Sequence, residues 1–238
     1  MRHVIIAHSL ASVGVMSAMM ALLAVFDQSW EYVYGWLGLA LITQAVSAGG
    51  SAAWPFADDG DLPEADEILL LSRPAAIVAF LTGVFVPVIA MLHAGFLDGI
   101  AGVAFGSVIL LAALYRLVFV AQPAEPATRI VGLPAAWGII GFYLHAFDAT
   151  PLASVLGIGL AIVLGLVPMN WPHPLHSERW PVMTRAIVVV WFGTAAATLW
   201  YGFPASPLSK SILLATALYG LILAAWIART SLHEQELV

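Results

Sequence analysis

The residues from Gly35 to Pro87 decide the fold, and they read GWLGLALITQAVSAGGSAAWPFADDGDLPEADEILLLSRPAAIVAFLTGVFVP. Two long apolar segments, one running to about Ala48 and one starting at Pro74, are joined by a connector rich in acids. Apolar runs of this length are typical of helices that cross a membrane, and a proline suits the first turn of a helix. The stretch therefore predicts two membrane helices that could frame an embedded site.

The composition of the whole chain supports the same class of protein. Of the 238 residues, 62% are hydrophobic and only 9% are charged, whereas a soluble domain has about 25% charged residues. The chain has no cysteine, which excludes disulfide and thiol chemistry, and it has no basic cluster of the kind that binds nucleic acid. We expect an integral membrane protein whose N-terminal segment is a spanning helix and not a removed signal peptide.

Hydrophobic segments of spanning length recur along the chain and predict about eight transmembrane helices in one all-α domain covering residues 1–238. The acidic connector occupies residues 50–73 of that domain. The expected spans are Val4–Phe26, Tyr32–Gly49, Pro74–Phe96, Gly99–Val120, Ile130–Phe147, Leu152–Val167, Met183–Trp200 and Ser209–Ala228.

The basic residues predict the orientation of these spans. In an eight-span layout every arginine lies near one side of the membrane, and only Lys210 lies near the other. Because loops that stay in the cytoplasm carry the excess of Lys and Arg, we expect both termini in the cytoplasm. Tryptophans near the predicted span ends suit an interfacial belt.

Four short segments resemble bacterial phosphatidylcholine synthases, which are members of the CDP-alcohol phosphatidyltransferase family. They are GWLGLALI (Gly35–Ile42), FLTGVFVP (Phe80–Pro87), LPAAWGIIGFYL (Leu133–Leu144) and LVPMNWPHPLHSERW (Leu166–Trp180). Their order and spacing extend the resemblance over roughly Ile5 to Trp200. The resemblance implies the fold of that family and a place in the bacterial cytoplasmic membrane.

The resemblance also implies where a catalytic site would lie. The family signature is D-x-x-D-G-x-x-A-R, a spacer, and G-x-x-x-D-x-x-x-D. Its four carboxylates, two on each of two helices, hold divalent metal over the diphosphate of a CDP-alcohol, and one of them acts as a base on the incoming hydroxyl. In this chain the four aspartate positions are occupied by Gln44, Ser47, Ala75 and Ala79, the glycine by Ala48 and the arginine by Ala52.

No shift of the alignment restores these carboxylates, because no acidic residue lies between Glu31 and Asp58 or between Glu67 and Asp98. The sequence therefore predicts no catalytic residue of the family type, no metal site at these positions and no cofactor.

Other charged and ionisable residues are weaker candidates. The connector acids Asp58, Asp59, Asp61 and Glu64 could contact a basic partner, although a solvated loop is the simpler interpretation. If a lipid phosphate binds, the candidates are Arg116, Arg129 and Arg179. Histidines near span ends, such as His93 and His145, are more typical of hydrogen-bonded or interfacial groups than of metal ligands.

These observations favour a non-catalytic relative of phosphatidylcholine synthase that serves as an accessory subunit of a larger membrane complex, photosynthetic or respiratory. Other membrane subunits and phospholipids are its expected partners, and nucleic acid is not. Two alternatives stay open. The chain could be an active synthase that transfers a phosphatidyl group from CDP-diacylglycerol to choline through a rewired site, or it could be a phospholipid-binding protein.

Overall fold

The computed structural model describes residues 2–52, 76–119, 129–131, 137–166, 170–172 and 180–235. Within those ranges, side chains are described except at residues 2–8, 46–52, 116–119, 129–131, 166, 170–172, 227, 228 and 230–235. The chain forms two compact units, which are treated separately below. Unit 1 comprises Met1–Ala121 and Ala135–Gly141, and unit 2 comprises Gln122–Pro134 and Phe142–Val238.

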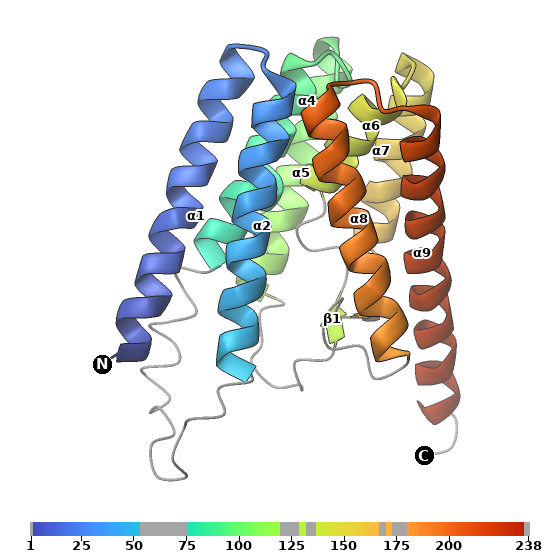
Figure 1. Cartoon of the computed structure of the whole chain (residues 1–238). Coiled ribbons are helices and arrows are strands. Elements are labelled where there is room, and N and C mark those ends of the chain that lie inside the picture. The colour runs from blue at the N-terminus through green and yellow to red at the C-terminus, as the bar shows by residue number, and fades with distance from the viewer. Residues whose placement is uncertain are drawn as a thin grey trace. The chain divides into compact units, whose positions relative to one another are not determined.

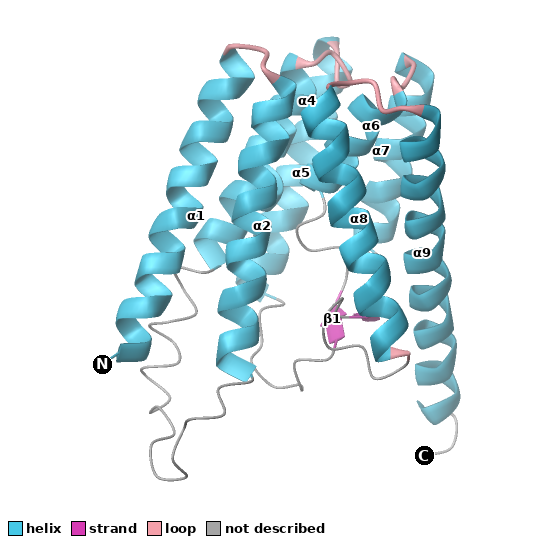
Figure 2. Ribbon diagram, viewed as in Figure 1, coloured by secondary structure: helices cyan, strands magenta, loops and turns pink. Residues whose placement is uncertain are grey.

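Helices make up nearly all of the described structure (Figures 1 and 2). In unit 1 they are α1 (Arg2–Phe26), α2 (Trp30–Ala52), a third span over Ala76–His93 that ends in α4 (Val86–His93), and α5 (Gly99–Phe119). Helix α6 (Trp137–Phe147) begins in unit 1 and ends in unit 2. Unit 2 also contains α7 (Pro151–Leu166), α8 (Pro181–Tyr201) and α9 (Pro207–Gln235).

Four of the described helices are long and apolar enough to cross a membrane: Ser9–Phe26, Ala76–His93, Pro181–Tyr201 and Pro207–Trp226. Shorter apolar helices cover Gly99–Tyr115, Trp137–Phe147 and Pro151–Gly165. A helix pairs its own backbone N–H and C=O groups, so it is the form that such apolar segments adopt in lipid. The predicted membrane protein of helices is therefore confirmed, while the count of eight spans stays a prediction.

Among the described residues, one pair of short strands accompanies the predicted helices. Strands β1 (Arg129–Val131) and β2 (Asn170–Pro172) pair antiparallel in unit 2, with Ile130 opposite Trp171. The predicted fifth span, Ile130–Phe147, is consequently wrong at its start, since α6 begins only at Trp137. β-Branched Ile130 and Val131 favour an extended backbone, and the pairing with β2 supplies the hydrogen bonds that a helix would have made internally.

Three helix ends explain how the chain reverses direction in so few residues. After α1, Gln28 N–H donates to the Val25 carbonyl at 3.0 Å and Ser29 N–H to the Ala24 carbonyl at 2.9 Å, with Gln28 at φ 54°. The ends of α4 and α6 repeat this pattern, with Gly95 at φ 76° and Asp148 at φ 52°. This is the Schellman arrangement, which pairs the last carbonyls of a helix and turns the chain.

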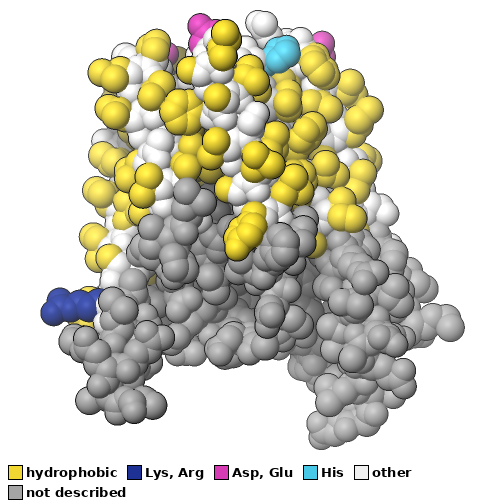
Figure 3. All heavy atoms as spheres, turned by 180° about the vertical axis from the view of Figure 1, so that it is seen from behind, with side chains coloured by type: hydrophobic (Ala, Val, Ile, Leu, Met, Phe, Trp, Pro, Cys, Tyr) yellow, Lys and Arg dark blue, Asp and Glu magenta, His cyan; other side chains and the backbone are white. Residues whose placement is uncertain are grey.

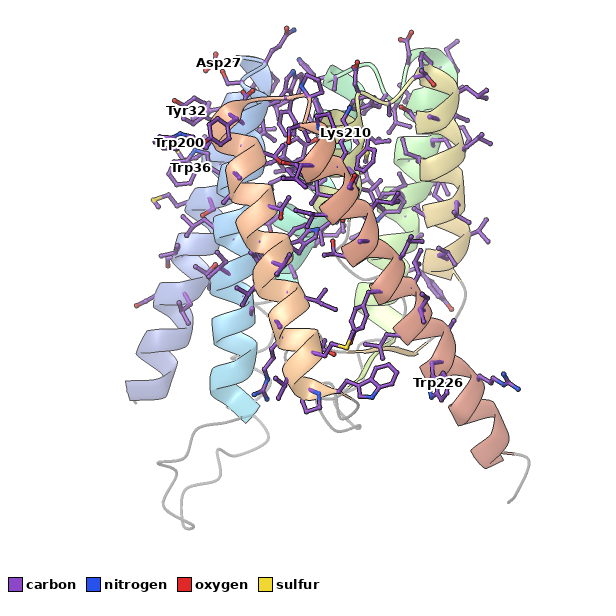
Figure 4. All side chains as sticks on the ribbon, turned by 45° about the vertical axis from the view of Figure 1, so that its right-hand side comes forward. Asp27, Tyr32, Trp36, Trp200, Lys210 and Trp226 are labelled. Atoms are coloured by element: carbon purple, nitrogen blue, oxygen red, sulfur yellow. The ribbon has the colours of Figure 1, made fainter. Side chains whose placement is uncertain are left out.

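The outward side chains are those expected of a protein in lipid. Ile100 in unit 1 is 91% exposed and Val182 in unit 2 is 78% exposed, and hydrophobic side chains predominate on the described surface in Figure 3. Tyr32 and Trp36 lie near the start of α2, just after the turn that contains Asp27, and Trp200 lies one residue before the end of α8 (Figure 4). Amphipathic aromatic rings at helix ends suit the membrane–water interface.

The core of unit 1 depends on close approach between α1 and the third span. Gly14 faces Val78, which is 3% exposed, and a Cβ at Gly14 would collide with the Cγ1 of Val78. Farther along, the ring of Phe26 meets that of His93 edge-on, with centroids 5.5 Å apart. Along both helices the contacts follow the same order in the sequence, Gly14 with Val78 and then Phe26 with His93, so the two helices run parallel. A small residue such as Gly14 permits the close packing.

A hydrogen-bonded group ties three helices together in unit 2. The Tyr143 hydroxyl donates to the Leu213 carbonyl at 2.9 Å and accepts from Trp191 Nε1 at 3.0 Å. At the end of α6, Ala205 N–H donates to the Ala146 carbonyl at 2.9 Å, and Lys210 Nζ reaches the Phe147 carbonyl at 3.5 Å. The last carbonyls of this short helix therefore gain donors from Ala205, in the α8–α9 connection, and from Lys210, in the first turn of α9, and a cation is favourable at a helix C-terminus.

Replacing Gly14 with Ala tests the packing of α1 on the third span. We expect G14A to destabilise the protein by about 1–3 kcal/mol, because the added methyl overpacks against Val78. In the double variant G14A/V78A the loss should be smaller than the sum of the two single losses, since Val78→Ala removes the colliding atom. Unfolding in mixed micelles measures these losses. The matched control is G38A, whose Cβ would meet nothing within 4 Å; an equal loss in that variant would contradict the packing argument.

Replacing Tyr143 with Phe tests the hydrogen-bonded group of unit 2. The variant keeps the ring but loses the donor to Leu213 and the acceptor for Trp191, so a loss of about 1–2 kcal/mol in unfolding free energy is expected. The control is Y201F, because Tyr201 is 86% exposed. Equal stability of Y143F and Y201F would show that the Tyr143 hydroxyl contributes nothing.

Candidate functional site

The described part of the site is a direct contact between α2 and the third span. Gln44, half-buried on α2, donates from Nε2 to the Thr82 hydroxyl oxygen at 2.7 Å. Thr82 is 4% exposed, and its hydroxyl donates in turn to the Val78 carbonyl at 2.7 Å. Gln44 occupies the first aspartate position of the resembled signature, and Thr82 follows the last of those positions, Ala79, by three residues. The two halves of the expected site are thus joined by a neutral hydrogen bond.

The backbone of the third span departs from a regular α-helix around Thr82. Residues Leu81–Phe85 form η1, a π-helical segment in which Val86 N–H donates to the Leu81 carbonyl, and α4 follows at once. Pro87 is the physical reason for the wider turn. Proline has no N–H, and its ring clashes with the carbonyl four residues earlier in a regular α-helix, whereas a π turn relieves that clash.

The Thr82 carbonyl has no backbone donor in either helical register. The α-helical donor would be Val86 N–H, which goes to Leu81, and the π-helical donor would be the nitrogen of Pro87, which has no hydrogen. This carbonyl oxygen lies 4.0 Å from where a Cβ at Gly138 would stand on α6. A Cβ at Gly138 would also lie close to the side chains of Pro87 and Leu37. Glycine at this position therefore lets α6 approach the π-helical segment closely.

The remaining signature positions are only partly described. Ala79 is half-buried in the third span. Ser47, Ala48 and Ala52 lie on α2, but their side chains are outside the described residues, and so is Ala75 altogether. The structure therefore brings one signature position, Gln44, into contact with the second helix of the pair.

The predicted binding residues fall mostly outside what the structure describes. The connector acids Asp58, Asp59, Asp61 and Glu64 lie there, as does Arg179. Arg116 is on α5 and Arg129 is in β1, where it pairs with Pro172, but neither side chain is described. Their proposed roles in contacting a partner or a lipid phosphate therefore stay predictions.

The chemistry of the described contact is uncharged. An amide and a hydroxyl orient neighbours by hydrogen bonds, but they bring no negative charge to balance a divalent cation, which prefers carboxylate oxygens. Among the residues that the structure describes, no three His, Cys, Asp or Glu side chains are grouped so that they could hold a metal ion. What this arrangement does is fix α2 against the third span.

Sequence reasoning missed Thr82, Pro87 and Gly138. A signal was present for two of them, since Pro87 lies inside an apolar run where a helix needs every donor, and Thr82 is a hydroxyl five residues before it. His93 and His145 were placed correctly near helix ends, where they lie against the rings of Phe26 and Phe203 with centroids 5.5 and 5.4 Å away.

Comparisons with known proteins point to one kind of relative. No protein-family model matches the chain. The phosphatidylcholine synthase of Bradyrhizobium diazoefficiens is 27% identical over 212 residues, which are 89% of this chain and 77% of that protein. The phosphatidylcholine synthase of Pseudomonas aeruginosa is 27% identical over 184 residues, or 77% and 74% of the two chains. That of Rhizobium meliloti is 22% identical over 213 residues, or 89% and 85%.

These matches cover most of both chains and share one name, and they agree with the short segments that resemble the same enzymes. The chain is therefore similar to bacterial phosphatidylcholine synthases along most of its length, as the resemblance to that branch of the CDP-alcohol phosphatidyltransferases predicted.

Proposed function

We propose that this protein handles phospholipid in the bacterial cytoplasmic membrane, and that the activity to test first is transfer of a phosphatidyl group from CDP-diacylglycerol to choline. The observation that carries the proposal is the match to proteins named phosphatidylcholine synthase along most of the chain. The apolar helices, with exposed side chains suited to lipid, agree with a membrane substrate. For this function the comparisons favour the catalytic alternative over the non-catalytic one.

In this reaction the choline hydroxyl oxygen would form a bond to the phosphorus of the phosphatidyl group. The bond from that phosphorus to the CMP oxygen would break, CMP would leave, and a base would take the hydroxyl proton. Gln44 cannot be that base, because an amide does not accept a proton near neutral pH. An active enzyme would therefore draw its carboxylates from elsewhere, and the acidic connector, with Asp58, Asp59 and Asp61, is the proposed source.

The proposed setting is an eight-span protein with both termini and the connector on the cytoplasmic side. On that side the nucleotide headgroup of CDP-diacylglycerol would face water. Charge placement supports this orientation. In unit 2, Lys210 lies in the first turn of α9, whereas Arg229 lies toward the other end of that helix. In unit 1, Asp27 and Asp98 lie in the turns that follow α1 and the third span.

The second candidate is a non-catalytic role, as an accessory subunit of a membrane complex or as a phospholipid-binding protein. One specific observation favours it: all four aspartate positions are neutral, and Gln44 bonds directly to Thr82. Such a protein would keep the arrangement of helices and act by binding. Its proposed contacts are the connector acids with a basic partner, and Arg116, Arg129 and Arg179 with lipid phosphate.

An assay of CMP release tests the first candidate. The full chain in bilayers with CDP-diacylglycerol, choline and Mn²⁺ or Mg²⁺ should release CMP in a choline-dependent way. Changing Asp58, Asp59 and Asp61 together to Ala should abolish the release, because no other proposed group holds the cation. The matched control is D98A, an acidic residue in the turn before α5 that is not part of the connector sequence. A well-folded parent chain that releases no more CMP than empty bilayers would refute the transfer reaction.

Gentle purification from native membrane, followed by native mass spectrometry, tests the second candidate. An accessory subunit should travel with a protein partner at fixed stoichiometry, and a lipid-binding protein should retain phospholipid without one. The connector variant should lose the partner if its acids form the contact. A chain that carries neither protein nor lipid would contradict both forms of the non-catalytic role.

A further inference from the structure

The third span consists of two parts that differ in how firmly they are packed. The outer part, α4, is buried at Val86, Pro87, Val88, Ala90 and Met91. Its neighbours come from several elements of unit 1. Pro87 lies near Gly138, Val88 near Gly106, Met91 near Gly141 and His93 against Phe26. Most of α4 is therefore packed against neighbours, although its last residue, His93, is exposed.

The inner part, Ala76–Leu81, is more exposed than α4. Only Val78 is buried there, while Ile77 is 56% exposed and the other residues are half-buried. Val78 of this part closely approaches Gly14 of α1, and Thr82, just beyond its outer boundary, accepts the hydrogen bond from Gln44. Among the described residues, the Gln44–Thr82 hydrogen bond is a polar contact between the third span and α2 at the edge of this part.

The π-helical segment lies between the two parts. Bends in helices occur at proline and at π turns, where the regular ladder of hydrogen bonds is interrupted. Here both features coincide, and the Thr82 carbonyl lacks a backbone donor in either register. The backbone is therefore weakest between a firmly packed outer part and a lightly packed inner part.

We propose that the third span is a hinged helix, in which the inner part pivots at Leu81–Phe85 and the Gln44–Thr82 hydrogen bond holds it in the position seen here. The proposal goes beyond the proposed function, because it requires no catalytic activity. The hinge sets the distance between α2 and Ala79, which are the two sides of the expected site. Breaking one hydrogen bond between helices in a membrane should raise the population of the moved state roughly three- to twenty-fold.

The chain has no cysteine, so spin labels attach only where cysteine is introduced. In the full chain in lipid nanodiscs, labels at I77C on the inner part and I100C on α5 report the hinge by pulsed electron paramagnetic resonance. Both native side chains are exposed, at 56% and 91%. We expect one narrow distance distribution in the parent, and a second population in T82V and in Q44L. A second label pair, Y32C and I100C, avoids the inner part and should stay unchanged.

Two control variants separate the hydrogen bond from a general loss of structure. T82S keeps the hydroxyl and should retain the parent distribution. T43V removes a hydroxyl that bonds only within its own helix, to the Ala40 carbonyl at 2.8 Å, one residue before Gln44; it should also retain that distribution. If T82V does not fold, Q44L alone decides. Parent-like distances in Q44L, or an equal shift in T43V, would overturn the proposal.

Discussion

A missing backbone donor in the middle of an apolar helix shapes unit 1. Within lipid each backbone N–H and C=O must find a partner inside the protein, because no water is there to supply one. Pro87 removes one donor from the third span, and the helix responds by widening over Leu81–Phe85. The contacts that surround this region, from Gly138 on α6 and from Gln44 on α2, follow from that single constraint. The missing N–H of Pro87 thus connects one residue of the sequence to the packing of unit 1.

The fold was largely predictable because hydrophobic length carries most of the information in a membrane protein. The ends of α5 and α7 differ from the predicted spans by a single residue at most. The predicted start of the fifth span was wrong because of one strand pairing. Ile130 and Val131 are as apolar as any helical residue, but strand pairing with Trp171 and Asn170, some forty residues away, decides their conformation. Hydropathy does not distinguish an apolar strand from an apolar helix when the segment is short.

The position of the candidate site stays a prediction. The resemblance named Gln44 as one of its residues, and the structure places Gln44 on α2 in contact with the third span. It could not show that Gln44 reaches Thr82, since the contact joins residues thirty-eight positions apart and depends on the widened turn. Thr82 would have attracted attention only in combination with Pro87. A threonine alone in a span more often bonds its own backbone, as Thr194 does with Val190.

A cation and a hydrogen bond hold two helices together in different ways. Carboxylates on facing helices repel one another until a divalent ion is bound, so their geometry depends on the ion. The contact between Gln44 and Thr82 needs no ion, because the amide donates directly and the hydroxyl accepts. A chain in which a neutral hydrogen bond replaces the facing carboxylates keeps its helices in place at any concentration of divalent cation. The same exchange removes negative charge from the interior of the bundle, where charge is costly. The sequence at these positions is thus consistent with retention of the arrangement of helices, whichever role the protein has.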